Sequence, residues 1–259
     1  MEGLMLADTG IVGSIPLAIG NLFNLQFFSI SGEIPDSIGK LECIDVLPDL
    51  LGVRTVRLVG SKDTSLSNMS SLNFLALGRN QLEGPIPSEL GSIGGLQALD
   101  LSRNNLSGVL PHTLYNLSML KGFLVNSNLL SGTIPADIGN RLPNIGFINF
   151  SSNRFHGTIP PSVSNLSALA TLALDGNNLS GYVPSTLGRL QSLIGLYLSD
   201  NKLEANDREG WEFVDMLANC SQLQRLILRN NSFSAKLPSS IANLSTTLKV
   251  LDLSDNRIS

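Results

Sequence analysis

Residues 96–119 read LQALDLSRNNLSGVLPHTLYNLSM, and residues 169–192 read LATLALDGNNLSGYVPSTLGRLQS. In both stretches leucine occupies positions 1, 4 and 6 of a 24-residue unit, and asparagine occupies position 9. The pattern recurs along most of the chain. Self-similarity at a fixed period of this length indicates a repeat architecture, and L-x-x-L-x-L-x-x-N is the pattern of the leucine-rich repeat.

The spacing within one unit predicts its local structure. Side chains alternate between the two faces of a strand, so the leucines at positions 4 and 6 share one face of a short strand. The chain then turns away at position 9, where buried backbone groups need partners. An asparagine amide both donates and accepts hydrogen bonds. We therefore expect a structural asparagine ladder formed by Asn80, Asn104, Asn128, Asn153, Asn177, Asn201, Asn231 and Asn256.

The second half of the unit carries a glycine followed three residues later by proline. Proline lacks a backbone donor and glycine tolerates unusual torsion angles. This pattern predicts a tight extended segment that leads into a short 3₁₀ or irregular turn. The pairs are Gly84 and Pro87, Gly108 and Pro111, Gly132 and Pro135, Gly157 and Pro160, and Gly181 and Pro184.

A single unit cannot bury its own apolar edge, so neighbouring units must stack. The fold class that follows is an α/β repeat, a curved right-handed leucine-rich-repeat solenoid. Short parallel strands line its concave face, and 3₁₀ or irregular turns line its convex side.

The repeats divide the chain into three stretches. Residues 1–24 form a regular unit, residues 25–71 form irregular or degenerate units, and residues 72–259 form a continuous array. The unit at 193–222 is extended, and the array is expected to be truncated at its C-terminus. Two readings of residues 25–71 remain open, a functional loop and a degenerate or wrongly joined set of repeats.

Composition excludes several classes of function. A net charge of −4 argues against a nucleic-acid-binding surface. The two cysteines and two histidines show no metal-ligand or catalytic spacing. We therefore predict no metal, no cofactor and no catalytic residue, so this chain is not expected to be an enzyme. No apolar run approaches the roughly 18 residues of a spanning helix, and no signal peptide is visible.

The string N-x-L-S-G-x-I-P-x-x-L/I-G-x-L resembles the plant-specific class of leucine-rich repeats, found in the ectodomains of plant receptor-like kinases. The extended unit, with Trp211, Phe213 and Cys220, resembles an insert of the immune-type subfamily that senses bacterial peptides or proteins. Such receptors also carry a signal peptide, terminal caps, a membrane helix and a Ser/Thr kinase, whose motifs are absent from this chain. The resemblance implies a full-length parent at the extracellular face of the plasma membrane, acting with a co-receptor kinase.

The strand geometry predicts which side chains form the binding surface. Positions 3, 5, 7 and 8 of each unit point outward on the expected concave face, and aromatic and arginine side chains are enriched in binding hot spots. The candidate ligand-binding residues are Arg79, Asp100, Arg103, Phe147, Asn149, Asp175, Tyr197, Asp200, Arg225, Arg229 and Asp252. Glycosylation sequons on the convex half, for a secreted parent, lie at Asn68, Asn116, Asn165 and Asn243.

Three hypotheses for function follow. The leading one is the peptide- or protein-recognition segment of a plant receptor-like kinase in defence signalling, without membrane contact by this segment itself. The second is a kinase-less secreted or receptor-like protein that inhibits a wall-degrading enzyme. The third is a non-functional gene fragment.

Overall fold

The computed structural model describes residues 3–6, 27–30, 72–80 and 82–259, with side chains from residue 72 onward. The chain forms two compact units, Met1–Leu130 and Ser131–Ser259. Asn68 and most of the stretch 25–71 lie outside the described residues.

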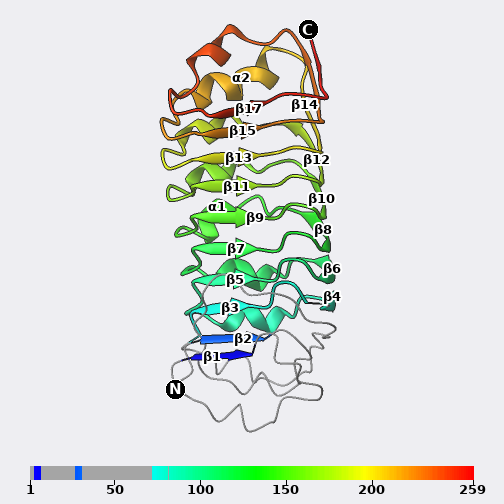
Figure 1. The fold of residues 1–259 in the computed structure, drawn as a ribbon, viewed down its shortest axis with the longest axis vertical. Helices are drawn as coiled ribbons and strands as arrows, with labels where there is room; N and C mark the ends of the chain where they lie inside the picture. The colour runs from blue at the N-terminus through cyan, green and yellow to red at the C-terminus, as the bar shows by residue number, and fades with distance from the viewer. Residues whose placement is uncertain (1–2, 7–26, 31–71, 81) are drawn as a thin grey trace. The chain divides into compact units, whose positions relative to one another are not determined.

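In the described part of the first unit, parallel strands from different repeats pair side by side (Figure 1). Its strands, in the order in which they pair, are β1 (Gly3–Leu6), β2 (Phe27–Ile30), β3 (Phe74–Ala76), β5 (Ala98–Asp100) and β7 (Gly122–Leu124). Between β3 and β5 the register joins Leu75 to Leu99, one 24-residue unit apart. Between β2 and β3 it joins Phe28 to Leu75, so nearly twice that length of chain separates two adjacent strands.

The second unit repeats this arrangement. Its strands, again in pairing order, are β9 (Phe147–Asn149), β11 (Thr171–Ala173), β13 (Gly195–Tyr197), β15 (Arg225–Ile227) and β17 (Val250–Asp252). All of these pairs are parallel and in register by unit position. The sequence prediction of a leucine-rich-repeat fold with short parallel strands is therefore confirmed.

A second set of parallel strands follows the turn in each repeat. In the first unit β4 (Glu83–Pro85) pairs with β6 (Asn105–Val109). In the second unit each strand of this set pairs with the corresponding strand of the next repeat, starting with the end of β8. These strands are β8 (Leu129–Thr133), β10 (Arg154–Gly157), β12 (Asn178–Tyr182), β14 (Lys202–Ala205), β16 (Ser232–Ala235) and β18 (Arg257–Ile258).

The glycine and proline of each repeat shape the segment that follows. Gly84, Gly108, Gly132, Gly157 and Gly181 all have positive φ, between 76° and 92°. Proline then directly precedes each 3₁₀ helix of a regular unit, because its fixed φ suits the start of a helical turn. These helices are η4 (Ser88–Ser92), η5 (His112–Asn116), η6 (Pro161–Asn165), η7 (Ser185–Arg189) and η8 (Ser239–Asn243).

In two of the described repeats an α-helix replaces the 3₁₀ turn, a feature that the repeat pattern did not predict. The helix α1 (Ile138–Arg141) is a single turn, and α2 (Arg208–Leu217) fills the extended unit. The Asp207 carboxylate caps α2 by accepting a hydrogen bond from the Gly210 amide at 2.8 Å. Trp211 and Phe213 are buried, and both rings pack against Phe233. The interpretation that these aromatics pack against the repeats is confirmed.

In six of the described repeats the asparagine at position 9 bonds to the repeat before it. The Asn104 Nδ2 lies 3.0 Å from the Leu101 oxygen in its own repeat and 2.9 Å from the Leu77 oxygen in the preceding repeat. Its Oδ1 accepts a hydrogen bond from the Leu82 amide at 3.0 Å. Asn128, Asn177, Asn201 and Asn231 make the corresponding bonds. The ladder therefore consists of side-chain bonds to backbone groups.

Replacing one ladder asparagine tests this arrangement. Asn104→Ala leaves the Leu82 amide without its side-chain acceptor in a site where Asn104 is 8% exposed, while the Leu77 carbonyl keeps its bond from the Asn80 Nδ2 at 3.0 Å. Since a buried unsatisfied group costs about 1–3 kcal/mol, we expect a loss of this size in unfolding free energy, measured by urea denaturation.

The neighbouring asparagine provides the control. Asn105 is exposed on β6, so Asn105→Ala is expected to change stability by less than about 0.5 kcal/mol. Equal effects of the two substitutions would contradict a structural role for Asn104.

Candidate ligand-binding face

The strand face is the surface formed by positions 3, 5, 7 and 8 of each repeat, and it contains all the candidate ligand-binding residues. Position 3 runs along adjacent strands of the second unit as Phe147, Thr171, Gly195 and Arg225. Phe147 is 38% exposed and Arg225 is exposed. A large apolar ring held at the surface is a feature of protein-binding surfaces.

Tyr197, at position 5, lies across the glycine of its own strand. A Cβ atom added to Gly195 would lie 2.6 Å from the Tyr197 Cε2 and 3.1 Å from its hydroxyl. The absence of a side chain at Gly195 therefore lets the tyrosine ring lie flat over the strand. Asn149, also at position 5, accepts a hydrogen bond from the Ser151 amide through Oδ1.

Asp175, at position 7, lies between two serines of neighbouring repeats. Its Oδ2 accepts a hydrogen bond from the Ser151 hydroxyl at 3.0 Å, and its Oδ1 accepts one from the Ser199 amide at 3.1 Å. Burial raises the pKa of the Asp175 carboxyl above its ordinary value of 3.8, and the negative charge of Asp200 acts in the same direction. The two hydrogen bonds lower the pKa but only partly offset burial.

Position 8 adopts a left-handed backbone conformation. Arg79, Arg103 and Asp200 have φ values of 58°, 55° and 53°. Such conformations cost non-glycine residues about 1–3 kcal/mol, and the surrounding bonds must maintain them. The turn places these three exposed side chains at the end of the strand rather than on it.

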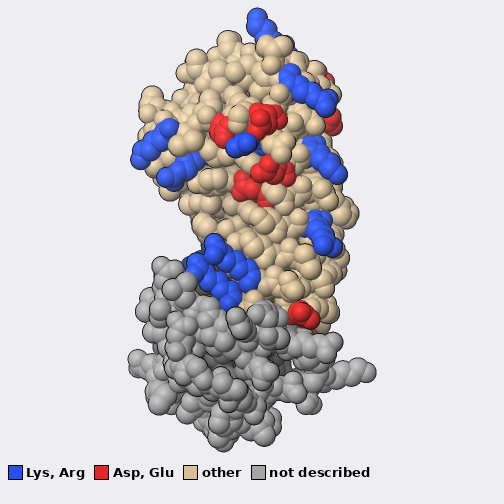
Figure 2. Space-filling view, turned by 45° about the vertical axis from the view of Figure 1, so that its right-hand side comes forward, with Lys and Arg blue, Asp and Glu red and all other residues tan. Residues whose placement is uncertain are grey.

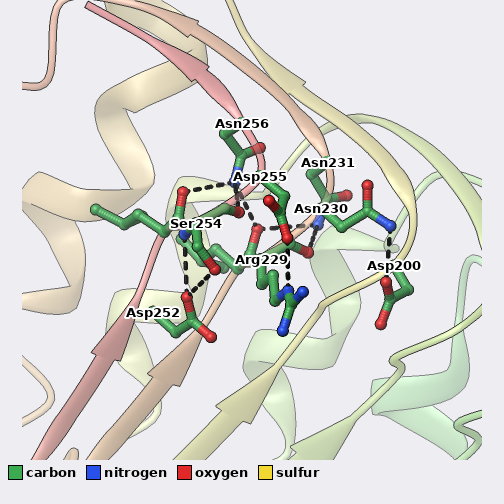
Figure 3. Close-up of polar contacts among 10 residues, drawn as sticks. Asp200, Arg229, Asn230, Asn231, Asp252, Ser254, Asp255 and Asn256 are labelled. Carbon is green, nitrogen blue, oxygen red and sulfur yellow. Dashed lines mark hydrogen bonds and ion pairs between the residues drawn. The ribbon is translucent and has the colours of Figure 1, made fainter.

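Polar contacts join side chains at positions 7 and 8 of neighbouring repeats in the second unit (Figure 3). The Arg229 Nε donates to the Asp255 Oδ2 at 2.7 Å, and the Asn230 Nδ2 donates to the Asp200 Oδ1 at 2.8 Å. Figure 2 shows acidic side chains gathered on the surface of the second unit, with a basic group among them. This part of the face carries more negative than positive charge, because Asp175, Asp200, Asp252 and Asp255 outnumber Arg225 and Arg229.

Asp100 and Asp252 have a local role as well as a place on the strand face. Each accepts a hydrogen bond from the backbone amide two residues later, Ser102 at 2.8 Å and Ser254 at 3.0 Å. Side chains of this type stabilise tight turns. Their carboxylates are therefore partly engaged by the chain itself.

Three sequon asparagines share one structural position. Asn116, Asn165 and Asn243 are exposed, and each is the last residue of a 3₁₀ helix, away from the strand face. The Asn165 Nδ2 donates to the Asn140 Oδ1 at 2.7 Å. Glycosylation at these positions remains a prediction.

Over the described residues, no group of three or more His, Cys, Asp or Glu side chains is arranged to hold a metal ion. The described helices include none with the length and apolar character needed to cross a membrane. Cys220 is buried, its thiol lies 3.6 Å from the Leu187 oxygen, and burial raises its pKa to about 11.

Comparisons with known proteins agree with this geometry. The Leucine Rich Repeat family model matches residues 95–117, 144–166 and 222–244. The chain is a leucine-rich-repeat solenoid. Over 70 residues it is 44% identical to the receptor kinase-like protein Xa21 of Oryza sativa subsp. japonica. Over 71 residues it is 45% identical to the LRR receptor-like serine/threonine-protein kinase EFR of Arabidopsis thaliana.

Each of these two alignments covers 27% of the solenoid and only 7% of the receptor kinase. An alignment with a solved structure covers a larger part of the chain. The whole solenoid aligns with 33% of the ectodomain of the Arabidopsis thaliana receptor kinase GASSHO1/SCHENGEN3, with a TM-score of 0.78 and 31% identity. That ectodomain was solved in complex with CASPARIAN STRIP INTEGRITY FACTOR 2. The solenoid is thus similar to plant receptor-kinase ectodomains, as the sequence resemblance implied.

Adding a methyl group at Gly195 tests the placement of Tyr197. We expect Gly195→Ala to displace the tyrosine ring, because the new Cβ would otherwise lie 2.6 Å from it. Since the ring can move into solvent, the stability change should stay below about 1 kcal/mol. The measurement is the loss of NMR contacts between the Tyr197 ring and residue 195.

Gly122→Ala is the matched control, since Gly122 holds the same unit position and its added Cβ would meet nothing closer than 3.7 Å. A Tyr197 ring that stays in place in Gly195→Ala would show that the glycine does not control its orientation.

The raised pKa of Asp175 predicts a pH-dependent stability. Because the folded chain holds the Asp175 proton more tightly than the unfolded chain, the stabilisation is fully present below the unfolded pKa, near 3.8. It is lost as pH rises through the raised folded value. Asp175→Asn does not titrate, so it should gain stability relative to the parent chain between pH 3 and pH 7. Thermal unfolding of both proteins at the two pH values measures this, and a constant difference would contradict it.

Proposed function

We propose that this solenoid is a ligand-recognition segment of a plant cell-surface receptor-like kinase, and that its strand face binds an extended peptide or a protein loop. The observation that carries the proposal is the row of outward-facing side chains on the second unit, in which Phe147 and Arg225 are exposed and Tyr197 is half-buried. Aromatic rings supply apolar contact area, and arginine supplies directional hydrogen bonds.

The parallel register makes this face suitable for an extended ligand. Equivalent positions of successive repeats lie on adjacent strands, so side chains recur across the sheet at the strand spacing of about 4.8 Å. A peptide that crosses the strands can therefore contact one repeat after another. Support from relatives comes from the GASSHO1/SCHENGEN3 ectodomain, which was solved with a bound factor.

The role of the full-length parent is part of the same proposal. The parent would lie at the extracellular face of the plasma membrane, and ligand binding would recruit a co-receptor kinase. The similarity to Xa21 and EFR supports a receptor-kinase parent. The defence role rests on the resemblance of the extended unit, residues 193–222, to the immune-type subfamily.

Selection from a random-peptide display library tests peptide recognition by the chain. Peptides that the parent chain enriches should lose binding by at least about tenfold when Phe147, Tyr197 and Arg229 are together replaced by alanine, since hot-spot side chains each contribute more than about 1 kcal/mol. Fluorescence anisotropy with the enriched peptides measures the affinity.

The control replaces three exposed α2 side chains, Glu212, Asp215 and Met216, by alanine. We expect this variant to bind the enriched peptides as the parent chain does. Unchanged binding by the strand-face variant would refute the proposed surface.

A further inference from the structure

Two aspartates of the strand face come together where β11 and β13 end. The strands pair with Ala173 opposite Tyr197. The pairing continues past the strands, since the Gly176 amide donates to the Ser199 oxygen at 2.9 Å and the Asn177 amide donates to the Asp200 oxygen at 3.1 Å. This register places Asp175 beside Ser199, directly next to Asp200.

The donors that the chain provides to these carboxylates are neutral. Asp175 accepts from the Ser151 hydroxyl and the Ser199 amide, and Asp200 accepts from the Asn230 amide group. The charged group that acts on Asp175 is Asp200, which has the same sign. Within the described residues, neither aspartate forms an ion pair.

The basic side chain of the same row is engaged elsewhere. Arg229 follows Ser199 at position 7 of the next repeat, but its Nε donates to Asp255 at 2.7 Å. Two adjacent carboxylates, one of them half-buried, therefore face outward, and neither has an ion-pair partner in the described part of the chain. Removing a carboxylate from water without a compensating cation is unfavourable. Binding of a cation from outside the chain at this place would therefore be favourable.

A second observation at the same place is independent of the charges. Ser199 is 7% exposed, and its hydroxyl is one of the buried polar atoms in the described chain that have no hydrogen-bond partner. Buried hydroxyls in folded proteins nearly always have a partner. The Ser199 side chain stands at position 7, between Asp175 and Arg229 of the neighbouring repeats. A polar group without a partner therefore lies in the same row, beside the two carboxylates.

We infer that Asp175, Ser199 and Asp200 form a subsite for an arginine side chain of the peptide that the strand face binds. The guanidinium group has five N–H donors, and the carboxylate oxygens of both aspartates can accept further hydrogen bonds beside those from the chain. One guanidinium can thus bond both aspartates, and charge-assisted bonds of this kind are about twice as strong as neutral ones. The inference rests on the proposed peptide recognition and assigns one residue type of the ligand.

Titration of the isotope-labelled full chain with N-acetylarginine amide tests the subsite without knowledge of the peptide. We expect the probe to shift the NMR signals of the Gly176, Ser199 and Asp200 amides. N-acetylcitrulline amide, which has nearly the same shape without the charge, should bind at least about tenfold more weakly, because bonds to a charged group contribute more than about 1.4 kcal/mol.

Asp175→Asn and Asp200→Asn should each weaken the arginine probe about tenfold. Both variants are expected to fold, because Asn126 and Asn230 occupy the same unit positions in other repeats. Asp215→Asn, on the exposed surface of α2, is the charge-matched control and should bind the probe as the parent chain does.

Ser199→Ala separates a ligand-binding role from a structural one. Because the hydroxyl has no partner in the free chain, its removal should leave the melting temperature unchanged or raise it, while weakening the arginine probe. A lower melting temperature with unchanged probe binding would show a structural serine and would remove it from the subsite.

The outcomes distinguish this inference from the proposed function. No shift with the arginine probe, equal binding of the citrulline probe, or unchanged binding by both aspartate variants would overturn the subsite. Peptides enriched on the strand face without a basic residue, and insensitive to Asp175→Asn, would also overturn it while leaving peptide recognition intact. Failure to enrich any peptide, together with charge-dependent binding of the arginine probe, would reject the proposed function and retain a cation site.

Discussion

The asparagine side chain at position 9 is the interaction on which the rest of the structure depends. Each turn after a strand has backbone groups that point into the protein, where water cannot reach them. Asn104 bonds to carbonyls of its own repeat and of the preceding one, and it accepts from the Leu82 amide across the same boundary. No single repeat can satisfy these groups, so the bond holds the turn and the stack together.

The binding surface is a consequence of that turn. Because the backbone is left-handed at position 8, the side chains of Arg103 and Asp200 emerge at the strand end, beside position 7 of the neighbouring repeat. The turn requires a particular backbone conformation and an asparagine at position 9, but it does not require particular side chains at positions 3, 5, 7 and 8. A repeat of this kind can therefore carry aromatic, acidic or basic groups on the same scaffold, and here the second unit carries Phe147, Tyr197 and the aspartates.

The interior follows the repeat closely except where the extended unit departs from it. Gly181 and Pro184 direct one repeat into an extended segment and a 3₁₀ turn, as the sequence predicted. The extended unit lacks that pair and instead forms α2, whose Trp211 donates its indole N–H to the Ser234 oxygen at 2.9 Å. Asp207 and the amphipathic run after it are a helix signal, but the repeat pattern alone did not predict a helix at this place.

The sequence by itself determined the repeat length, the buried leucines, the asparagine ladder and the positions that face outward, because each follows from a fixed spacing within one unit. Contacts between units were decided only by the tertiary structure. Asp175 and Asp200 lie 25 positions apart in sequence, and only the register of β11 against β13 brings them together. Likewise Arg229 pairs with Asp255, and among the described residues neither of these two carboxylates forms an ion pair. A one-unit pattern cannot specify such pairs, since their energies depend on which side chains of different repeats meet.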